Sequence, residues 1–153
     1  MKFINEVIEV KPKKYLDFID LTEEIEKLVN KSNIKNGFVL VYSTHTTLAI
    51  CVNEKEKRIC RDFEVLMNKL IPKDAYYYHN DLTIRTENLV CQSASSDCLN
   101  GHSHCTHLLM RNSETIPIID GKIMLGTWQR IFAIELDCCR PRKVLVQISG
   151  LEN

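Results

Sequence analysis

Short apolar runs rich in β-branched and aromatic side chains recur along this chain of 153 residues and constrain its fold more than any other feature. Runs of this composition and length are typical of strands that bury one face of a sheet. Such runs occupy residues 38–43, 48–52, 114–119, 122–126, 130–136 and 143–148. The Asp120-Gly121 pair between two of them is a hairpin turn signal. The C-terminal third is therefore predicted to be antiparallel sheet.

The first residues of the chain have the same strand-like character. Apolar residues between positions 3 and 18 fall into two short runs, and Lys11-Pro12-Lys13 separates the runs with a turn signal. We therefore expect a β-hairpin, or a similar pair of strands, to open the fold.

Two segments have helical periodicity instead. Asp20 and Thr22 are each suitable N-caps for a segment with one apolar stripe, which predicts a helix that ends near Gly37. In residues 56–70 the apolar positions recur at helical spacing, and Pro72 follows them. We expect a second helix here, with its apolar face in the core.

The segment after the second predicted helix lacks clear periodicity. Residues 76–98 are aromatic, polar and rich in serine, which predicts a long ordered loop, and loops of this length usually carry function or are mobile. A short helix is expected at residues 105–110. The order of strand-like and helical segments predicts an α+β fold with a largely antiparallel sheet and two to four helices.

Length and charge limit the classes of partner. The chain is about as long as one domain, so residues 1–153 are predicted to form a single domain. The 20 Lys and Arg residues balance the 20 Asp and Glu residues, which leaves no overall field to attract nucleic acid or an anionic membrane surface. The apolar runs are far shorter than the roughly 20 residues that cross a bilayer. We expect no nucleic-acid partner and no membrane partner.

Cysteine usage and the N-terminus indicate a cytoplasmic protein. Seven cysteines are an odd number without a repeated spacing, which favours free thiols in a reducing compartment. Polar residues, beginning with Asn5 and Glu6, interrupt what would be the apolar core of a signal peptide. Small buried thiols are the favoured interpretation for Cys51, Cys60, Cys138 and Cys139.

The histidines are the first candidates for a functional site. All five fall at the ends of predicted elements or in loops: His45, His79, His102, His104 and His107. The spacing of His102 and His104 places two rings on one side of an extended segment, and two rings need one or two more ligands to hold zinc. On a helix, His104 and His107 would share a face instead. The sequence leaves the pairing open.

Two carboxylates join the candidates. His45 precedes a strand-like run and Glu54 follows it, while Asp62 lies in the second predicted helix, one step off the apolar stripe. Each carboxylate is either solvated or directed at a rim shared with His45, and spacing does not decide. Histidines exchange protons near neutrality, and carboxylates orient them, hold metals or act as bases. These residue types favour acid–base or metal chemistry.

Several common site motifs are missing from the sequence. It contains no dinucleotide-binding, P-loop, serine-hydrolase or zincin pattern. Basic residues near the last two strand runs either bind phosphate or are simply solvated. They are Arg130, Arg140, Arg142 and Lys143.

Taken in order, several short motifs resemble the YjbQ-like, UPF0047 family. They are Ser43-Thr44-His45-Thr46-Thr47, Asn53-Glu54, Arg61-Asp62, Tyr78-His79-Asn80-Asp81, Asn100 with Ser103-His104, Ser113 with Pro117, and Gly121 with Leu125-Gly126-Thr127-Trp128-Gln129. The likeness extends from Asp20 to Gly150. A His-Thr-Thr motif followed at this distance by Leu-Gly-Thr-Trp-Gln is a specific combination.

The resemblance implies a sandwich-like α+β domain that assembles as a homotrimer with polar sites near the subunit contacts. It also implies a weak, secondary thiamine-phosphate synthase activity, which joins a pyrimidine pyrophosphate to a thiazole phosphate. The polar positions of the family motifs fall on catalytic candidates His45, Glu54, Asp62, His79 and His104, on substrate-binding candidates Thr46, Thr47, Ser113, Trp128, Gln129 and Arg142, and on Glu135.

Three functions remain open from the sequence. The first is a transferase for a small phosphorylated metabolite, in which a divalent cation such as Mg²⁺ or arginines would hold the leaving pyrophosphate. The second is a metal-dependent hydrolase or isomerase, in which His45, His79 and His104 would hold zinc and Glu54 would act as a base. The third is a non-catalytic binder of a phosphorylated metabolite.

Overall fold

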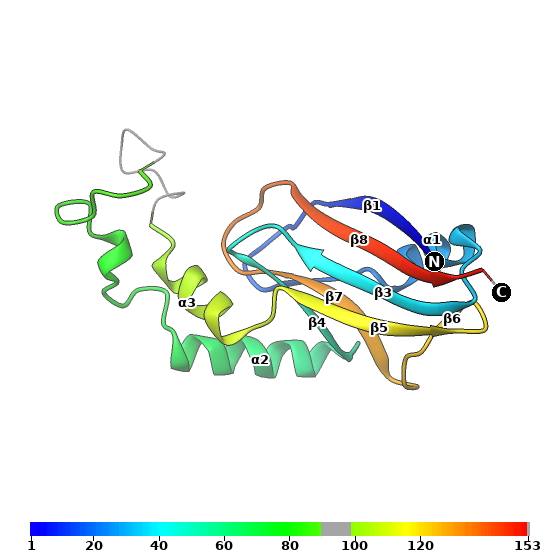
Figure 1. Ribbon diagram of the computed structural model, residues 1–153. Helices are drawn as coiled ribbons and strands as arrows, with labels where there is room; N and C mark the ends of the chain where they lie inside the picture. The colour runs from blue at the N-terminus through cyan, green and yellow to red at the C-terminus, as the bar shows by residue number, and fades with distance from the viewer. Residues whose placement is uncertain (90–98, 153) are drawn as a thin grey trace.

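The computed structural model describes residues 1–89 and 99–152 and contains two antiparallel sheets that pack face to face (Figure 1). The first sheet has five strands in the order β1-β8-β3-β5-β6, and the second has three in the order β2-β7-β4. The described elements are β1 (Lys2–Val10), β2 (Asp17–Asp20), α1 (Thr22–Ser32), β3 (Asn36–Ser43), β4 (Leu48–Glu54), α2 (Lys57–Leu70), the 3₁₀ helix η1 (Tyr78–Asn80), α3 (Gly101–Leu109), β5 (Ser113–Ile119), β6 (Lys122–Ile123), β7 (Gln129–Glu135) and β8 (Arg142–Leu151). The predicted α+β class is confirmed.

The two opening strands belong to different sheets. β1 pairs along its whole length with β8, and β2 pairs with β7. The predicted N-terminal hairpin is therefore wrong. The turn signal at residues 11–13 does mark the end of β1, but both strands find their partners in the C-terminal third, and such long-range pairing leaves no local trace in the sequence.

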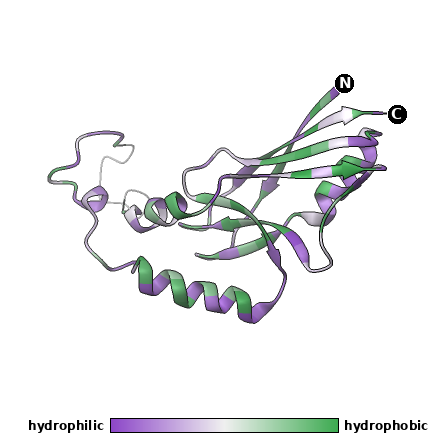
Figure 2. Ribbon diagram, turned by 60° about the horizontal axis from the view of Figure 1, so that its bottom comes forward, coloured by the Kyte–Doolittle hydropathy of each residue, from purple (hydrophilic) through white to green (hydrophobic). Residues whose placement is uncertain are grey.

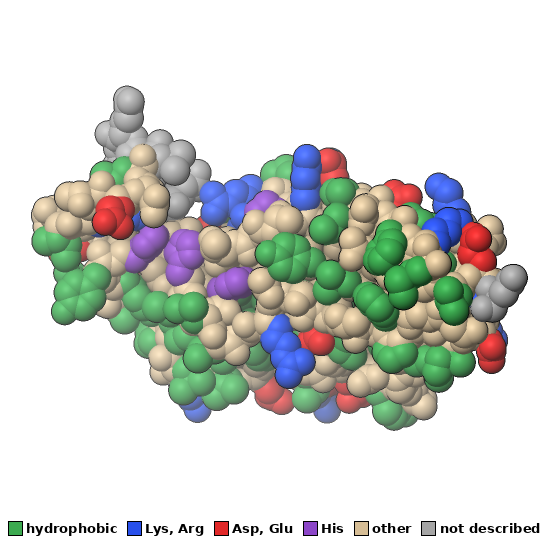
Figure 3. Space-filling view, viewed as in Figure 1, with side chains coloured by type: hydrophobic (Ala, Val, Ile, Leu, Met, Phe, Trp, Pro, Cys, Tyr) green, Lys and Arg blue, Asp and Glu red, His purple; other side chains and the backbone are tan. Residues whose placement is uncertain are grey.

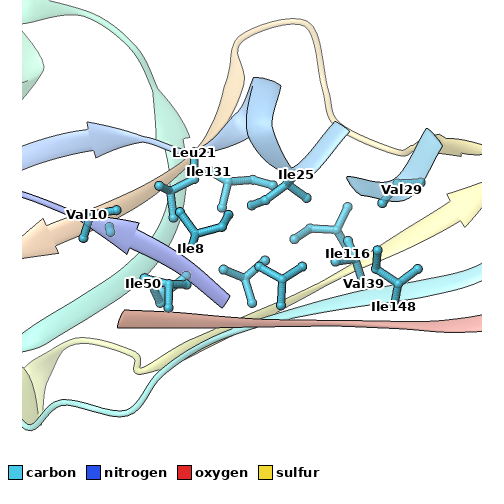
Figure 4. Close-up of a cluster of buried hydrophobic side chains, with 14 of the residues drawn as sticks. Ile8, Val10, Leu21, Ile25, Val29, Val39, Ile50, Ile116, Ile131 and Ile148 are labelled. Carbon is cyan, nitrogen blue, oxygen red and sulfur yellow. The ribbon is translucent and has the colours of Figure 1, made fainter. Parts of the chain in front are cut away.

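The main core fills the space between the two sheets. Figure 4 shows aliphatic side chains from both sheets and from α1 meeting there, among them Ile8, Val39, Ile131 and Ile25. These side chains are at most 2% exposed. Each buried side chain of this size stabilises the fold by about 1.5–3 kcal/mol relative to exposure. Buried and more exposed residues alternate along β1 and β3, which explains why these strands could be recognised from the sequence.

Helix α2 covers only part of the second sheet. Phe63 and Met67 pack against a smaller cluster, where the Phe63 ring meets the Phe18 ring edge to face at 5.6 Å. Leu66 and Leu70 stay exposed, so the expectation that the whole apolar face lies in the core is wrong in part. Apolar and polar residues both remain visible around this helix in Figure 2.

Two helix boundaries differ from the prediction. Helix α1 ends at Ser32, ahead of the expected Gly37, because Asn33 adopts the left-handed conformation that terminates helices. Helix α3 begins at Gly101, four residues before the expected start. His102 and His104 therefore lie on a helix, and the extended-strand pairing considered for them is wrong.

The predicted hairpin at Asp120-Gly121 is confirmed. Asp120 and Gly121 both have positive φ, at 50° and 78°, as two-residue turns between antiparallel strands require. The strand after the turn is shorter than expected, because β6 contains only Lys122 and Ile123.

Three connections meet at one end of the sandwich, beside α3 (Figure 1). The β3–β4 loop contacts the β7–β8 connection, because the Leu136 N–H donates to the Thr47 carbonyl at 3.0 Å. Asn100, just before α3, bonds to Asp137 in the same connection.

Within the described ranges, no helix is long and apolar enough to span a bilayer.

Candidate functional site

Two imidazoles lie side by side where η1 meets α3. The ring centroids of His79 and His104 are 4.6 Å apart, with 58° between the ring planes. Gly101 allows this approach, because a Cβ at that position would lie 2.6 Å from the Cβ of Tyr77. The Gly101 N–H also donates to Asn80 Oδ1 at 2.8 Å. Local packing of η1 on α3 therefore sets the histidine pair.

Asn100 and Asp137 connect this pair to the β7–β8 connection. His79 Nε2 lies 3.1 Å from Asn100 Oδ1, and Asn100 Nδ2 donates to Asp137 Oδ2 at 2.9 Å. The Asp137 carboxylate also forms an ion pair with Arg140. Asn100 and Asp137 are both buried, so a chain of polar contacts with a buried centre joins an imidazole to a carboxylate–guanidinium pair.

A second ion pair, between Glu135 and Arg142, lies deeper. Arg142 Nε donates to Glu135 Oε2 at 2.6 Å, a terminal guanidinium nitrogen bonds Oε1, and Arg142 also donates to Thr47 Oγ1 at 3.2 Å. The side chains are 0% and 4% exposed. Burying two charges is favourable only when their hydrogen bonds are satisfied. The Asp137 N–H donates a further hydrogen bond to Glu135 Oε1 at 2.9 Å. We therefore expect Arg142 to order the site, whereas direct phosphate binding by Arg142 stays a prediction.

His45 lies between β3 and β4 and is fixed by the main chain of β8. Its Nε2 accepts the Lys143 N–H at 2.9 Å. A backbone N–H can only donate, so the neutral His45 ring carries its proton on Nδ1. The loop itself is held by Ser43, whose Oγ accepts the His45 N–H at 3.2 Å. His45 is thus a fixed hydrogen-bond donor.

The environment keeps these histidines neutral. Burial lowers the pKa of His45, and the Arg142 guanidinium lowers it further. Burial also lowers the pKa of His79 and His104, with further contributions from Arg85 at His79 and from the His79 ring at His104. A neutral imidazole can accept a proton at pH 7. Figure 3 shows histidines gathered on one face, at the end where the helices join the sheets.

The two predicted carboxylates lie elsewhere in the chain. Glu54 is the exposed last residue of β4 and pairs with Gln129, and Asp62 is exposed on α2. His45 precedes the opposite end of β4, and a strand of this length spans about 20 Å. Within one chain, Glu54 therefore does not share a rim with His45.

The other motif residues divide between the same two ends. Thr47 is buried next to Arg142, and the neighbouring Thr46 is exposed. Trp128 is 72% exposed, and Gln129 Oε1 accepts the Gly126 N–H at 2.8 Å. Ser113 opens β5 opposite Tyr42. We call the His45, His79 and His104 region the histidine end, and the Glu54, Trp128 and Gln129 region the tryptophan end.

The predicted metal ligands are not grouped around a common point within the described part of one chain. Among residues 1–89 and 99–152, no group of three or more His, Cys, Asp or Glu side chains is arranged to hold a metal ion. The Nε2 lone pair of His45 is already engaged by Lys143, and the carboxylates of Glu135 and Asp137 are paired with arginines. A metal held by His45, His79 and His104 stays a prediction that requires ligands from another copy.

Sequence reasoning missed Asp137 as a site residue. Asp137 comes directly after the apolar run that ends with buried Leu136. An acidic side chain is uncommon at such a position. That signal, together with Arg140 three residues later, was available. What the sequence did not contain was the bond to Asn100, because the two residues come from distant segments.

The described cysteines are free thiols, as expected. Burial raises the pKa of Cys51 to about 12, so this thiol is a poor nucleophile. Cys139 is exposed, so the interpretation of this residue as a small buried thiol is wrong. Cys91 and Cys98 lie outside the described residues.

Fold and site together define a small two-sheet α+β protein with a histidine-rich site at one end of the sandwich. The family model described as "UPF0047 protein YjbQ-like" matches residues 6–151, and the chain belongs to this family. A UPF0047 protein of Methanothermobacter thermautotrophicus is 33% identical over 98% of this chain and 94% of its own length. One from Archaeoglobus fulgidus is 34% identical over 92% of this chain and 97% of its own length.

Solved structures show the same fold. A YbjQ-like protein of unknown function from Sulfolobus solfataricus superposes with a TM-score of 0.84 at 30% identity, covering 97% of this chain and 98% of that chain. A protein of the YjbQ/UPF0047 family from Clostridium acetobutylicum gives 0.80 at 33% identity, covering 94% of this chain and 99% of that chain.

Proposed function

We propose that the chain is a cytoplasmic transferase for phosphorylated heterocycles, with the thiamine-phosphate-synthase type of reaction that the family resemblance implied. The observation that supports this most is the histidine end, where neutral imidazoles lie beside the buried Glu135–Arg142 pair and the partly exposed Asp137–Arg140 pair. The free thiols of the described cysteines support the cytoplasmic location.

The reaction requires stabilisation of a leaving group. The bond between the methylene carbon of the pyrimidine and the pyrophosphate oxygen breaks, and the electron pair leaves with pyrophosphate. The thiazole nitrogen then supplies the pair for the new carbon–nitrogen bond. Fixed N–H donors stabilise charge that develops on a leaving oxygen, and the Nδ1–H of His45 is such a donor. No step here depends on a metal, because the described residues contain no group of His, Cys, Asp or Glu side chains arranged to hold one.

The protein is further proposed to act as a homotrimer. The outward face of the five-stranded sheet carries exposed apolar side chains on both strands that flank β8, with Phe3 and Val7 on β1 and Phe38 on β3, and Figure 3 looks onto this face. Extended exposed apolar surfaces mark interfaces. Motif residues divided between two ends of one chain fit a ring in which the histidine end of one copy meets the tryptophan end of the next.

Sedimentation tests the assembly. Wild-type protein is expected to sediment at three times the mass of the chain. Phe38→Glu is expected to sediment as a monomer, because the substitution would bury an unpaired charge at each subunit interface. The matched variant Asn68→Glu, exposed on α2 and away from this sheet face, should leave the mass unchanged. A monomeric wild type would contradict the proposed trimer.

Turnover tests the reaction. Purified protein is incubated with the pyrimidine pyrophosphate and the thiazole phosphate, with and without Mg²⁺, and thiamine phosphate is measured by chromatography. Loss of a positioned acid–base group typically costs 10²–10⁴-fold, so His104→Ala should lower the rate by about 10²-fold or more. His107→Ala, on the same helix, should change it less than about threefold. Equal rates for wild type and His104→Ala would contradict the proposal.

A metal-dependent hydrolase or isomerase is the second candidate, favoured by the 4.6 Å spacing of the His79 and His104 rings. Elemental analysis separates the two. Stoichiometric zinc that disappears in His79→Ala and His104→Ala would favour the hydrolase or isomerase. Micromolar binding of a phosphorylated ligand that is recovered unchanged would instead favour the non-catalytic binder.

A further inference from the structure

The amide of Asn100 is bound on both sides. Its Nδ2 donates to Asp137 Oδ2 at 2.9 Å, and its Oδ1 lies 3.1 Å from His79 Nε2. Asn100 is only 5% exposed, so water does not compete strongly for these contacts. The side chain therefore has little freedom to choose other partners.

Asp137 dictates which way this amide points. An ionised carboxylate only accepts hydrogen bonds, and the Asp137 carboxylate is ion-paired with Arg140. The reversed amide would place the Asn100 carbonyl oxygen against a carboxylate oxygen at hydrogen-bond distance, which is repulsive. The carbonyl oxygen of Asn100 consequently faces His79.

We infer that Asn100, oriented by Asp137, is a positioning residue that keeps the ring proton of His79 on Nε2 and leaves the Nδ1 lone pair as a hydrogen-bond acceptor for the substrate. The carbonyl oxygen can only accept, so His79 Nε2 must donate. In the described part of the chain, Nδ1 of His79 has no hydrogen-bond partner. The inference rests on the proposed function only in naming the occupant of the site.

The consequence is a division of roles between two histidines. His45 is held with its proton on Nδ1 by a backbone N–H, and His79 is held with its proton on Nε2 by a side-chain carbonyl. His45 therefore offers a donor, which suits a phosphate oxygen, whereas His79 offers an acceptor, which suits an N–H or O–H group of the ligand. A ligand with an anionic group and a polar hydrogen on its ring matches both.

The tautomer is measured directly by nuclear magnetic resonance. Full-length protein labelled with ¹⁵N in histidine is studied at about pH 8.5, roughly two units above the ordinary imidazole pKa, and the His79 signals are assigned by their loss in His79→Gln. The form with the proton on Nε2 should exceed the other roughly tenfold or more, as expected when the alternative leaves a buried carbonyl unpaired. A proton on Nδ1, or equal populations, would overturn the inference.

An exchange of the two partners tests the role of Asp137. Asp137→Asn gives an amide that can donate or accept, so the direction of the Asn100 amide is no longer fixed. The ratio of the Nε2-protonated to the Nδ1-protonated form of His79 should then fall at least about threefold. The double variant Asn100→Asp with Asp137→Asn reverses the pair and should restore the wild-type excess. Asp120→Asn, in an exposed turn, is the matched control and should change nothing.

Each outcome decides a separate point. An unchanged excess in Asp137→Asn would show that Asp137 does not orient Asn100. If Asp137→Asn fails to fold, the wild type and the double variant still give the answer. The tautomer is read without any turnover, so a protein that fails the thiamine-phosphate assay but shows the expected His79 signals would overturn the proposed function alone.

Discussion

Strand β7 carries an ion pair near each end, and the two pairs lie in different surroundings. At the tryptophan end, Arg130 binds Asp20 at 2.9 Å, with side chains 29% and 12% exposed. At the histidine end, Glu135 and Arg142 are almost fully buried. The same pairing of carboxylate and guanidinium thus occurs once near solvent and once in the interior.

The difference shows what a buried pair contributes to a site. A pair in contact with solvent is worth about 0–1 kcal/mol, whereas removing one partner of a buried pair costs about 3–5 kcal/mol. The buried pair links β7, β8 and the β3–β4 loop, because Arg142 also holds Thr47. Rigidity at the histidine end therefore depends on a few buried charges. Substituting individual charges at the two ends of β7 tests whether the ends differ in this way.

Glu135→Gln is expected to have the largest effect on stability. It leaves the Arg142 guanidinium buried without its counter-charge, so the free energy of unfolding should fall by about 3–5 kcal/mol. Urea denaturation of both proteins at pH 7 measures the change. A loss below about 1 kcal/mol would show that the two ends of β7 do not differ as proposed.

Acidification is expected to loosen the histidine end first. Burial lowers the pKa of His45, His79 and His104, so these rings bind fewer protons when folded than when unfolded. Their contribution to stability is complete above the ordinary histidine pKa of 6.5 and is lost as pH falls below it. Hydrogen exchange, corrected for intrinsic rates, should show α3 amides losing protection between about pH 6.5 and 5. Equal loss along β1 would contradict this.

Asp20→Asn is expected to have a smaller effect. Partial burial raises the pKa of the Asp20 carboxyl, but bonds to Thr22, Lys55 and Arg130 outweigh it and lower the pKa to about 2. The stabilisation is present above the ordinary pKa of 3.8 and is lost as pH falls through about 2. Solvent screening limits the loss in the variant at pH 7 to about 1 kcal/mol. Urea denaturation at pH 7 and pH 3 should show the gap between the two proteins narrowing at the lower pH, and a constant gap would contradict the assignment.

Glu64→Gln is expected to have the smallest effect. The Arg61–Glu64 pair lies on the surface of α2, with side chains 67% and 31% exposed and 2.8 Å between its charged atoms. Pairs one turn apart on a helix surface contribute about 0.2–0.5 kcal/mol. Thermal unfolding should be nearly unchanged, and a loss above about 1 kcal/mol would mean that α2 contributes more than an exposed pair explains.

Local patterns predicted the elements well, but not the partners of each strand. Helix α2 runs from Lys57 to Leu70, within a residue of the expected segment, because its periodicity and the following Pro72 are local signals. The pairing of β1 with β8 joins the two ends of the chain, and no local signal specifies it. The expected hairpin failed for this reason.

The candidate site was predictable in its residue types more than in its geometry. His79 and His104 were expected to act together, and their contact depends on Gly101, whose missing side chain brings η1 onto α3. Spacing left open whether Glu54 shares a rim with His45, and the length of β4 separates the two residues. Burial of the Arg142 charge depends on both sheets, so a single segment of sequence gives no sign of it.

Ligand location tests the central claim, that chemistry belongs to the histidine end, most directly. Full-length protein labelled with ¹⁵N is titrated with inorganic pyrophosphate and the amide and imidazole signals are followed. We predict saturable shifts at His45, His79 and His104 that clearly exceed any shifts at Asp20 and Arg130. Shifts confined to Asp20 and Arg130, or no saturable shift at any histidine, would contradict the account.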